Sequence, residues 1–190
     1  MSITMKHAVR PLVTAFALVT AAATLGHGQP LRAVDIAAEE RSAEMLIGER
    51  VNAERARLTP EAPALASDPT LTQIAQLRSE AMAHGAPFAH EDENGRFVAG
   101  DLVHRDFGLY GAVAENIMME RDPARAFDAV AFARRAVAGW MGSEGHRANI
   151  LSRDFNRSGI GVAVNGSYVY ATQVFWGPPT KPLGRGRRRP

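Results

Sequence analysis

The 190-residue sequence contains no cysteine, so neither disulfide bonds nor thiol chemistry are available to it. Aromatic residues make up only 7% of the chain, and its longest uncharged apolar stretch falls short of the roughly 20 residues that a helix needs to cross a bilayer. Hydrophobic residues nevertheless account for 46% of the chain and charged residues for 22%. This balance is typical of a globular protein that relies on a hydrophobic core.

The body of the chain also lacks an excess of basic residues. The formal charge of the whole chain is +2, but seven of its 22 basic residues lie at the two ends: Lys6, Arg10, Lys181, Arg185, Arg187, Arg188 and Arg189. The other 15 stand against 20 acidic residues, so residues 29–180 carry a formal charge of about −5. A nucleic-acid-binding surface needs a basic face, so we exclude nucleic acid as a partner.

Motifs of several enzyme classes are missing as well. We find no nucleophile elbow, phosphate loop, dinucleotide fingerprint or His-Glu-x-x-His metalloprotease spacing. The segment from His90 to Gly95 only faintly resembles a calcium loop, because histidine replaces the first aspartate and Asp101 stands where the loop needs glutamate. A solvated turn is the better interpretation.

The first 28 residues have the three-part pattern of a secretory signal peptide. A short basic region ends at Arg10, an uncharged stretch of 15 residues runs from Pro11 to Leu25, and small residues follow. We expect cleavage after Gly28 or after Ala23, which would leave no stable membrane span. An uncleaved membrane anchor is the alternative. The pattern predicts an exported protein, periplasmic or extracellular.

The last residues, from Gly184 to Pro190, form a basic, glycine-rich tail with too little apolar surface to fold. A solvated end is the favoured interpretation. Contact with an anionic envelope polymer or a lipid headgroup is the alternative.

Helical spacing of apolar residues predicts helices over 35–58, 69–84 and 123–142. The segment from Gly85 to Gly111 is polar and irregular, with at most a short helix near 97–106. We expect Asp35 and Asp68 to cap the first two, Gly85 to stop the second, and Pro123 to begin the last. Leu77 is placed on the apolar face of the second helix, together with Leu71, Ile74, Ala75 and Met82. The apolar stripe expected for the last helix is Phe127, Val130, Ala131, Arg134, Val137, Ala138 and Met141.

The end of the chain changes to a period of two. Apolar residues alternate from Ile160 to Val164 and from Tyr168 to Trp176, and Asn165-Gly166 between them is a strong signal for a hairpin turn. Helices followed by an antiparallel hairpin predict an α+β fold.

Five segments resemble, in the right order, the CAP superfamily of cysteine-rich secretory, antigen-five and pathogenesis-related-one proteins, in its short cysteine-free bacterial form. They are residues 51–55, 71–82 with 88–90, 114–117, 140–151, and 159–162 with 172–175. The resemblance implies an α-β-α sandwich with helices flanking a small antiparallel sheet. It divides the chain into a signal peptide (1–28), a lead-in (29–42), a CAP domain (43–177) and a basic tail (178–190).

The resemblance also implies a central cleft lined by two histidines and two glutamates that can hold a divalent metal such as zinc. The matching residues are His90, His146 and Glu115. Ser143 occupies the position of the second glutamate, three residues after Trp140, so the set is incomplete. Glu144 is adjacent, but a shift of one residue turns a helical side chain by about 100°.

Each residue of these motifs has a structural alternative. Glu115 could bond backbone N–H groups, His146 could pack against Trp140, and Arg147 could pair with Glu144. We expect Asn116 and Asn149 to fix turns through bonds to the backbone, and Ser143 to cap the helix after it by accepting from the N–H of His146. A polar, hydrogen-bonded cleft without metal is the structural alternative to the metal site.

Three functions remain open. The first is an exported protein that binds a small apolar molecule, a lipid, an envelope component or a divalent metal in the cleft. The second is a metal-dependent hydrolase that uses His90, Glu115 and His146. The third is a structural domain without a ligand. The missing second carboxylate favours binding over catalysis.

Overall fold

The computed structural model describes residues 35–121 and 127–179. Its elements in chain order are α1 (Ile36–Leu58), β1 (Ala66–Ser67), α2 (Pro69–Ala83), α3 (Val98–Asp101), the π-helical turn η1 (Leu102–Asp106), β2 (Ala112–Arg121), α4 (Ala129–Gly142), α5 (Glu144–Leu151), β3 (Arg157–Asn165) and β4 (Tyr168–Gly177). The expected signal peptide, the basic tail and a helix start at Pro123 lie outside the described residues. No helix in the described residues is long and apolar enough to cross a membrane.

Local capping sets the ends of α1 and α2, as the sequence predicts. The Asp35 carboxylate accepts a hydrogen bond from Ala38 N at 3.2 Å. The Asp68 carboxylate accepts from the backbone N–H groups of residues 70 and 71 at 2.9 and 3.2 Å. Gly85 ends α2 with a φ of 105°, which glycine adopts without strain. Leu77 is 44% exposed, so its assignment to the apolar face of α2 is wrong.

Helix α4 begins at Ala129, with the Asp128 carboxylate accepting from Ala131 N at 3.0 Å. Our expected stripe for this helix is only partly right, because Val130 is 58% exposed and Arg134 also faces solvent. The face that is actually buried consists of Ala129, Phe132, Ala133, Ala136, Val137 and Trp140. Alanine stands on both faces of this helix, so the alanines by themselves did not mark the buried face.

The sheet has the strand order β1-β3-β4-β2, which confirms the α+β class. β3 and β4 form the predicted antiparallel hairpin, and Gly166 takes a φ of 61° in its turn. β2 pairs antiparallel with the other side of β4, whereas the two-residue β1 pairs parallel with β3. The sequence did not reveal β2, because polar residues occupy its centre.

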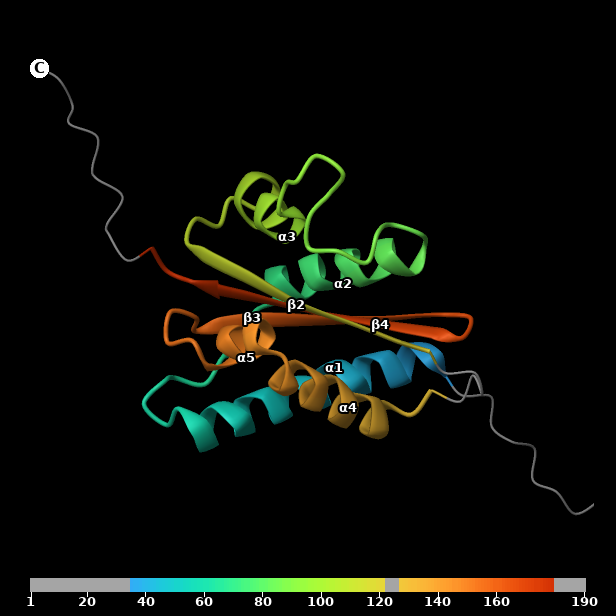
Figure 1. Ribbon diagram of the computed structural model, residues 1–190, viewed down its shortest axis with the longest axis horizontal. Helices are drawn as coiled ribbons and strands as arrows, with labels where there is room; N and C mark the ends of the chain where they lie inside the picture. Colours follow the sequence, from blue (N-terminus) through green and yellow to red (C-terminus); the bar gives the residue numbers. More distant parts are fainter. Residues whose placement is uncertain (1–34, 122–126, 180–190) are drawn as a thin grey trace, which may run out of the picture. The chain divides into compact units, whose positions relative to one another are not determined.

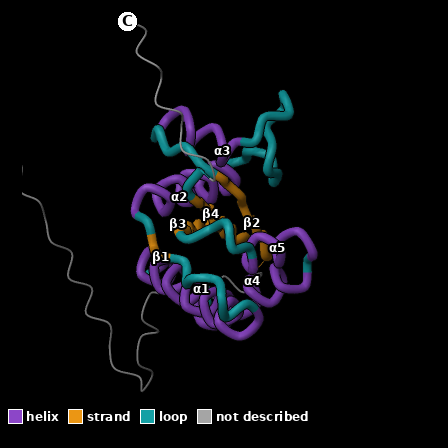
Figure 2. Tube along the Cα trace, turned by 90° about the vertical axis from the view of Figure 1, so that its left-hand side faces the viewer, coloured by secondary structure: helices purple, strands orange, loops and turns teal. Residues whose placement is uncertain are grey.

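Helices cover both faces of this sheet (Figure 1). α1 and α4 lie against one face, in a core that includes Ile47, Phe132 and Phe175. α2 and α3 lie against the other face, in a smaller core that includes Leu71 and Val174. Figure 2 shows the same three layers after a quarter turn, with α5 beside β2. The expected α-β-α sandwich is therefore the fold.

Two glycines in β3 let α2 approach the sheet closely. A Cβ atom on Gly159 would lie 2.0 Å from the backbone of Leu71, and one on Gly161 would lie 2.3 Å from the N atom of Gln76. Any larger residue at either position would push α2 away.

Carboxylates from α1 close the free edge of β3. Glu44 accepts from the backbone N–H of Val162 at 3.1 Å, and Glu40 accepts from Val164 at 2.7 Å. Burial raises the pKa of both carboxyls above the ordinary value. These bonds satisfy donors that would otherwise invite pairing with another strand.

A buried arginine ties α5 to α1. Arg55 is 1% exposed and donates only to backbone carbonyls. Its acceptors are Pro63 at 2.6 Å, Ile150 at 2.6 Å, Ser152 at 2.8 Å and Phe155 at 3.2 Å. Burial lowers the pKa of this guanidinium. The fork geometry of one side chain thus fixes the position of α5, which carries His146.

Candidate functional site

Glu115 lies at the centre of the expected site, on β2, with its side chain fully buried. Arg78 of α2, with a side chain only 6% exposed, lies directly against it. Arg78 Nε donates to Glu115 Oε1 at 2.8 Å and Nη2 donates to Oε2 at 3.3 Å. Both carboxylate oxygens are therefore bonded to one guanidinium, in a buried and formally neutral pair.

His90 lies on the loop that follows α2 and reaches the same carboxylate. Its Nδ1 atom is 2.9 Å from Glu115 Oε2, and its side chain remains 42% exposed. Arg78 Nη2 also donates to the backbone carbonyl of Ala89 at 2.6 Å. One guanidinium thus holds both the carboxylate and the loop that carries the histidine.

His146 approaches from α5, on the other side of β2. Its ring lies edge-on to that of His90, with centroids 5.9 Å apart and planes at 65°. Burial is the main cause of a lowered pKa at His146, and the nearby His90 adds to it. His146 therefore favours its neutral form near neutral pH. The structure brings together His90, Glu115 and His146, and we call these three residues the histidine cluster.

The remaining residues of the motif hold α4 and α5 against β2. Asn116 Nδ2 donates to the carbonyl of His146 at 3.2 Å, and Asn149 Nδ2 donates to Asn116 Oδ1 at 3.0 Å and to the carbonyl of Glu115 at 3.3 Å. Trp140 Nε1 donates to the carbonyl of Ile117 at 3.0 Å. These bonds to the backbone fix the wall that carries His146.

Ser143 is the N-cap residue of α5, but its side chain forms no capping bond. The expected bond to the N–H of His146 is therefore absent, and the prediction was wrong. The Ser143 carbonyl instead accepts from Arg147 N at 2.8 Å. Within the described residues, Arg147 forms no salt bridge with Glu144, so that alternative is wrong too.

The Glu115 carboxylate does not bond backbone N–H groups, as one alternative held, because Arg78 and His90 occupy it. Sequence reasoning missed Arg78. Its signal was its position: it stands seven residues after Leu71 and four before Met82, on the apolar face of α2. A charged residue on such a face is buried only when it has a partner.

The donor set fits a three-ligand metal site poorly. Both Glu115 oxygens are engaged, and no group of three or more histidine, cysteine or acidic side chains in the described ranges is arranged to hold a metal ion. Only the two imidazoles, of His90 and His146, remain as metal ligands.

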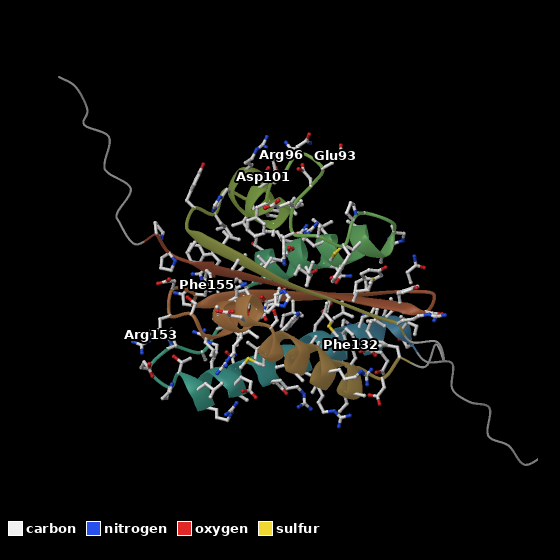
Figure 3. The ribbon with its side chains drawn as sticks, viewed as in Figure 1. Glu93, Arg96, Asp101, Phe132, Arg153 and Phe155 are labelled. Atoms are coloured by element: carbon white, nitrogen blue, oxygen red, sulfur yellow. The ribbon has the colours of Figure 1, made fainter. Side chains whose placement is uncertain are left out.

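The loop that faintly resembles a calcium site is a charged turn. The Asp92 carboxylate accepts from the backbone of Asn94 and Arg96 and pairs with the Arg96 guanidinium at 2.6 Å. These bonds lower the pKa of Asp92 to about 2. Figure 3 places Glu93 and Arg96 at the outer end of this loop, away from the sheet.

Two surface hollows, of about 520 and 530 Å³, lie at the opposite edge of the sheet from the histidine cluster. They are found between α1 and α2, and Arg41, Glu44 and Thr72 line both of them. Neither contains a histidine. The histidine cluster and these two hollows therefore lie at different edges of the sheet.

The α-β-α sandwich brings His90 and His146 together with Glu115 of the outer strand β2, and the sequence comparison assigns this chain to a family. The model of the CAP family, described as the cysteine-rich secretory protein family, matches residues 49–176. The chain therefore belongs to this family, although it contains no cysteine.

Two bacterial proteins are similar to this chain. YkwD of Bacillus subtilis, described as uncharacterized, is 32% identical over 138 residues, which cover 70% of this chain and 47% of YkwD. An extracellular protein with an SCP domain from Bacillus anthracis is 28% identical, with a TM-score of 0.55, over 73% of this chain and 41% of that one. The chain thus spans less than half the length of these two relatives.

An outer surface protein from Borrelia burgdorferi shares the fold with a TM-score of 0.58 and 13% identity. The match covers 73% of this chain and 94% of that protein. At this identity the likeness concerns the fold alone.

Proposed function

We propose that this protein is exported and acts by binding, with the histidine cluster as its recognition point. Two observations support export: the signal-peptide pattern of residues 1–28 and a Bacillus anthracis relative described as extracellular. The proposed location is periplasmic or extracellular.

The single observation that carries binding over catalysis is the engaged state of Glu115. A hydrolase of this type needs a carboxylate free to bind the metal or to take a proton from water. Here Arg78 bonds both oxygens, and Ser143 stands where the second carboxylate of the family would be. Two partly exposed imidazoles are left to meet a ligand.

The chemistry of these imidazoles limits the ligand. A neutral imidazole can accept a hydrogen bond or bind a soft divalent cation, but it attracts anions weakly. The ligand is therefore a lipid, a small apolar molecule or another envelope component that carries a polar hydrogen-bond donor. A divalent cation such as zinc, held by two nitrogens, is the second candidate.

Retention of envelope lipids by purified mature protein tests this proposal. The protein starting at Gln29 is incubated with lipid extract from a bacterial envelope, separated from free lipid and analysed by mass spectrometry. We expect a bound lipid species that His90→Ala and His146→Ala each reduce at least about tenfold, which corresponds to 1.4 kcal/mol. His84→Ala is the control, because His84 is exposed and lies outside the cluster. Retention equal to that of denatured protein would refute lipid binding.

Zinc titration distinguishes the hydrolase alternative from the binding function. Its supporting observation is the 5.9 Å distance between the two imidazole rings. A hydrolase would bind zinc near one equivalent and cleave ester or peptide reporters, and the double variant His90→Ala/His146→Ala would abolish both. We expect weak zinc binding and no turnover. A structural domain would give neither lipid retention nor zinc binding.

A further inference from the structure

Arg78 is the buried cation beneath the histidine cluster, and its guanidinium has two partners, a carboxylate and a backbone carbonyl. Nε and Nη2 bond the Glu115 carboxylate, and Nη2 also bonds the carbonyl of Ala89, one residue before His90. Arg78 is 5% exposed and Glu115 is 4% exposed. Arg78 is therefore too buried to contact a ligand, and it can act on the site only through Glu115 and the Ala89 carbonyl.

The geometry requires a guanidinium. Its planar fork can meet two carboxylate oxygens and a carbonyl at once, whereas a lysine ammonium acts as a point charge on a flexible stem. A lysine at this position could restore the charge opposite Glu115. It would not reproduce the fork that also holds the loop at Ala89.

The orientation of Glu115 has a consequence for His90. An ionised carboxylate is only an acceptor, so His90 Nδ1 must donate to Oε2 across the 2.9 Å between them. The other ring nitrogen, Nε2, is then the one left for a ligand. Because the carboxylate takes the proton-bearing nitrogen of the imidazole, it determines that the other ring nitrogen contacts the ligand.

We propose that Arg78 is the positioning residue of the histidine cluster: through Glu115 it holds His90 with its proton on Nδ1, and it keeps the carboxylate out of the ligand set. This deepens the proposed function, because it makes the cluster a recognition point of two imidazole nitrogens without a free charge. Ligands that require a carboxylate partner, such as calcium or an ammonium group, are excluded by the same pair.

Nitrogen-15 NMR of the histidine rings tests the proposal without any ligand. In the wild-type protein near neutral pH we expect one His90 signal set, with the proton on Nδ1. In Arg78→Gln the buried carboxylate loses its cation, so the single Nδ1–H signature should be lost, either to the doubly protonated ring or to the Nε2–H form. Arg78→Lys should restore it at least partly. Arg57→Gln is the matched control, because Arg57 is exposed on α1.

A second variant keeps the test valid if Arg78→Gln fails to fold. Replacing both members, Arg78→Met with Glu115→Leu, removes the buried charges together, and such replacements are often tolerated. His90 then has no acceptor for Nδ1–H, and its signature should again be lost. Unchanged His90 ring signals in a folded variant of either kind would overturn the proposal.

The two proposals fail separately. If Arg78→Gln changes the His90 signals but wild-type protein retains no lipid and binds no zinc, the positioning role stands and the binding function falls. If lipid is retained but the His90 signals do not depend on Arg78, the binding function stands and the positioning role falls.

Discussion

At the scale of single residues, the domain depends on two buried arginines with different partners. Arg55 meets only carbonyl oxygens, whereas Arg78 meets a carboxylate and a carbonyl. In both cases one planar fork joins segments far apart in the sequence. A chain without disulfides thus uses guanidinium groups to fix its irregular segments.

The lowered pKa of His146 predicts a pH dependence of stability. The unfolded chain binds a proton at this histidine near its ordinary pKa of 6.5, whereas the folded chain binds it only at lower pH. The unfolded state therefore holds more protons in that window, so stability is full above 6.5 and is lost as the pH falls toward the lowered pKa. We expect His146→Gln to lose less stability than wild type between pH 7.5 and pH 5, measured by urea unfolding.

The control for this experiment is His84→Gln, at an exposed histidine on the C-cap of α2. It should lose stability over the same pH range as wild type does. Equal pH profiles for wild type and His146→Gln would show that His146 is not buried in its neutral form.

At the scale of elements, the contact of α2 with β3 depends on glycine. An alanine at Gly161 would place its Cβ 2.3 Å from Gln76 N, so α2 would have to move. We expect Gly161→Ala to lower the free energy of unfolding by about 3 kcal/mol, the upper part of the usual range for overpacking.

Gly48→Ala, on α1, is the matched control for Gly161→Ala. Its Cβ would lie 3.5 Å from Ile160 Cδ1, an ordinary contact, and alanine favours a helix interior over glycine by about 0.5–1 kcal/mol. We expect this variant to be at least as stable as wild type in urea unfolding. A similar loss for both variants would contradict the tight packing of α2 on β3.

The Glu44 bond to the edge of β3 predicts different effects for two substitutions. Glu44→Ala leaves the Val162 N–H without a partner and should cost about 1–3 kcal/mol. Glu44→Gln keeps an acceptor oxygen and removes a charge that burial disfavours, so it should be at least as stable at pH 7. Chemical unfolding of both variants, with exposed Glu49→Ala as control, checks this difference.

The same carboxyl carries a pH signature. Its raised pKa means that the folded state holds more protons than the unfolded state above the ordinary value of 4.5, so wild-type stability falls as the pH rises from 4.5 through the raised pKa. In Glu44→Gln the loss of stability that comes from titration of this carboxyl should be absent. If the two pH profiles coincide, the Glu44 carboxyl does not titrate differently in the folded state.

Short sequence patterns predicted the helix ends that depend on bonds between neighbouring residues. They did not predict elements whose position depends on residues far apart in the sequence. Asp35, Asp68 and Gly85 set helix ends by themselves, so those ends could be predicted. β2 could not, because Glu115 and Asn116 become buried only through partners on α2 and α5. The meeting of the histidines likewise came from the family resemblance, since sequence spacing alone does not bring them together.

At the scale of the whole molecule, export predicts a shortened chain. We expect mass spectrometry of protein recovered from the periplasm or medium to give an N-terminus at Gln29 or Thr24. Replacing Leu18 with Arg in the apolar stretch should reduce export, because a charge disrupts that region of the signal. Recovery of the chain with Met1 intact would support the uncleaved anchor.

Both margins of the sheet are closed by side chains from helices. Glu40 and Glu44 occupy amide groups of β3, and Trp140 and Asn149 occupy carbonyl groups of β2. The tryptophan and asparagine of the family signature thus have a structural role at this edge of the sheet, whatever the cluster binds. Without these side chains, backbone groups at both margins would be open to pairing with a strand of another chain.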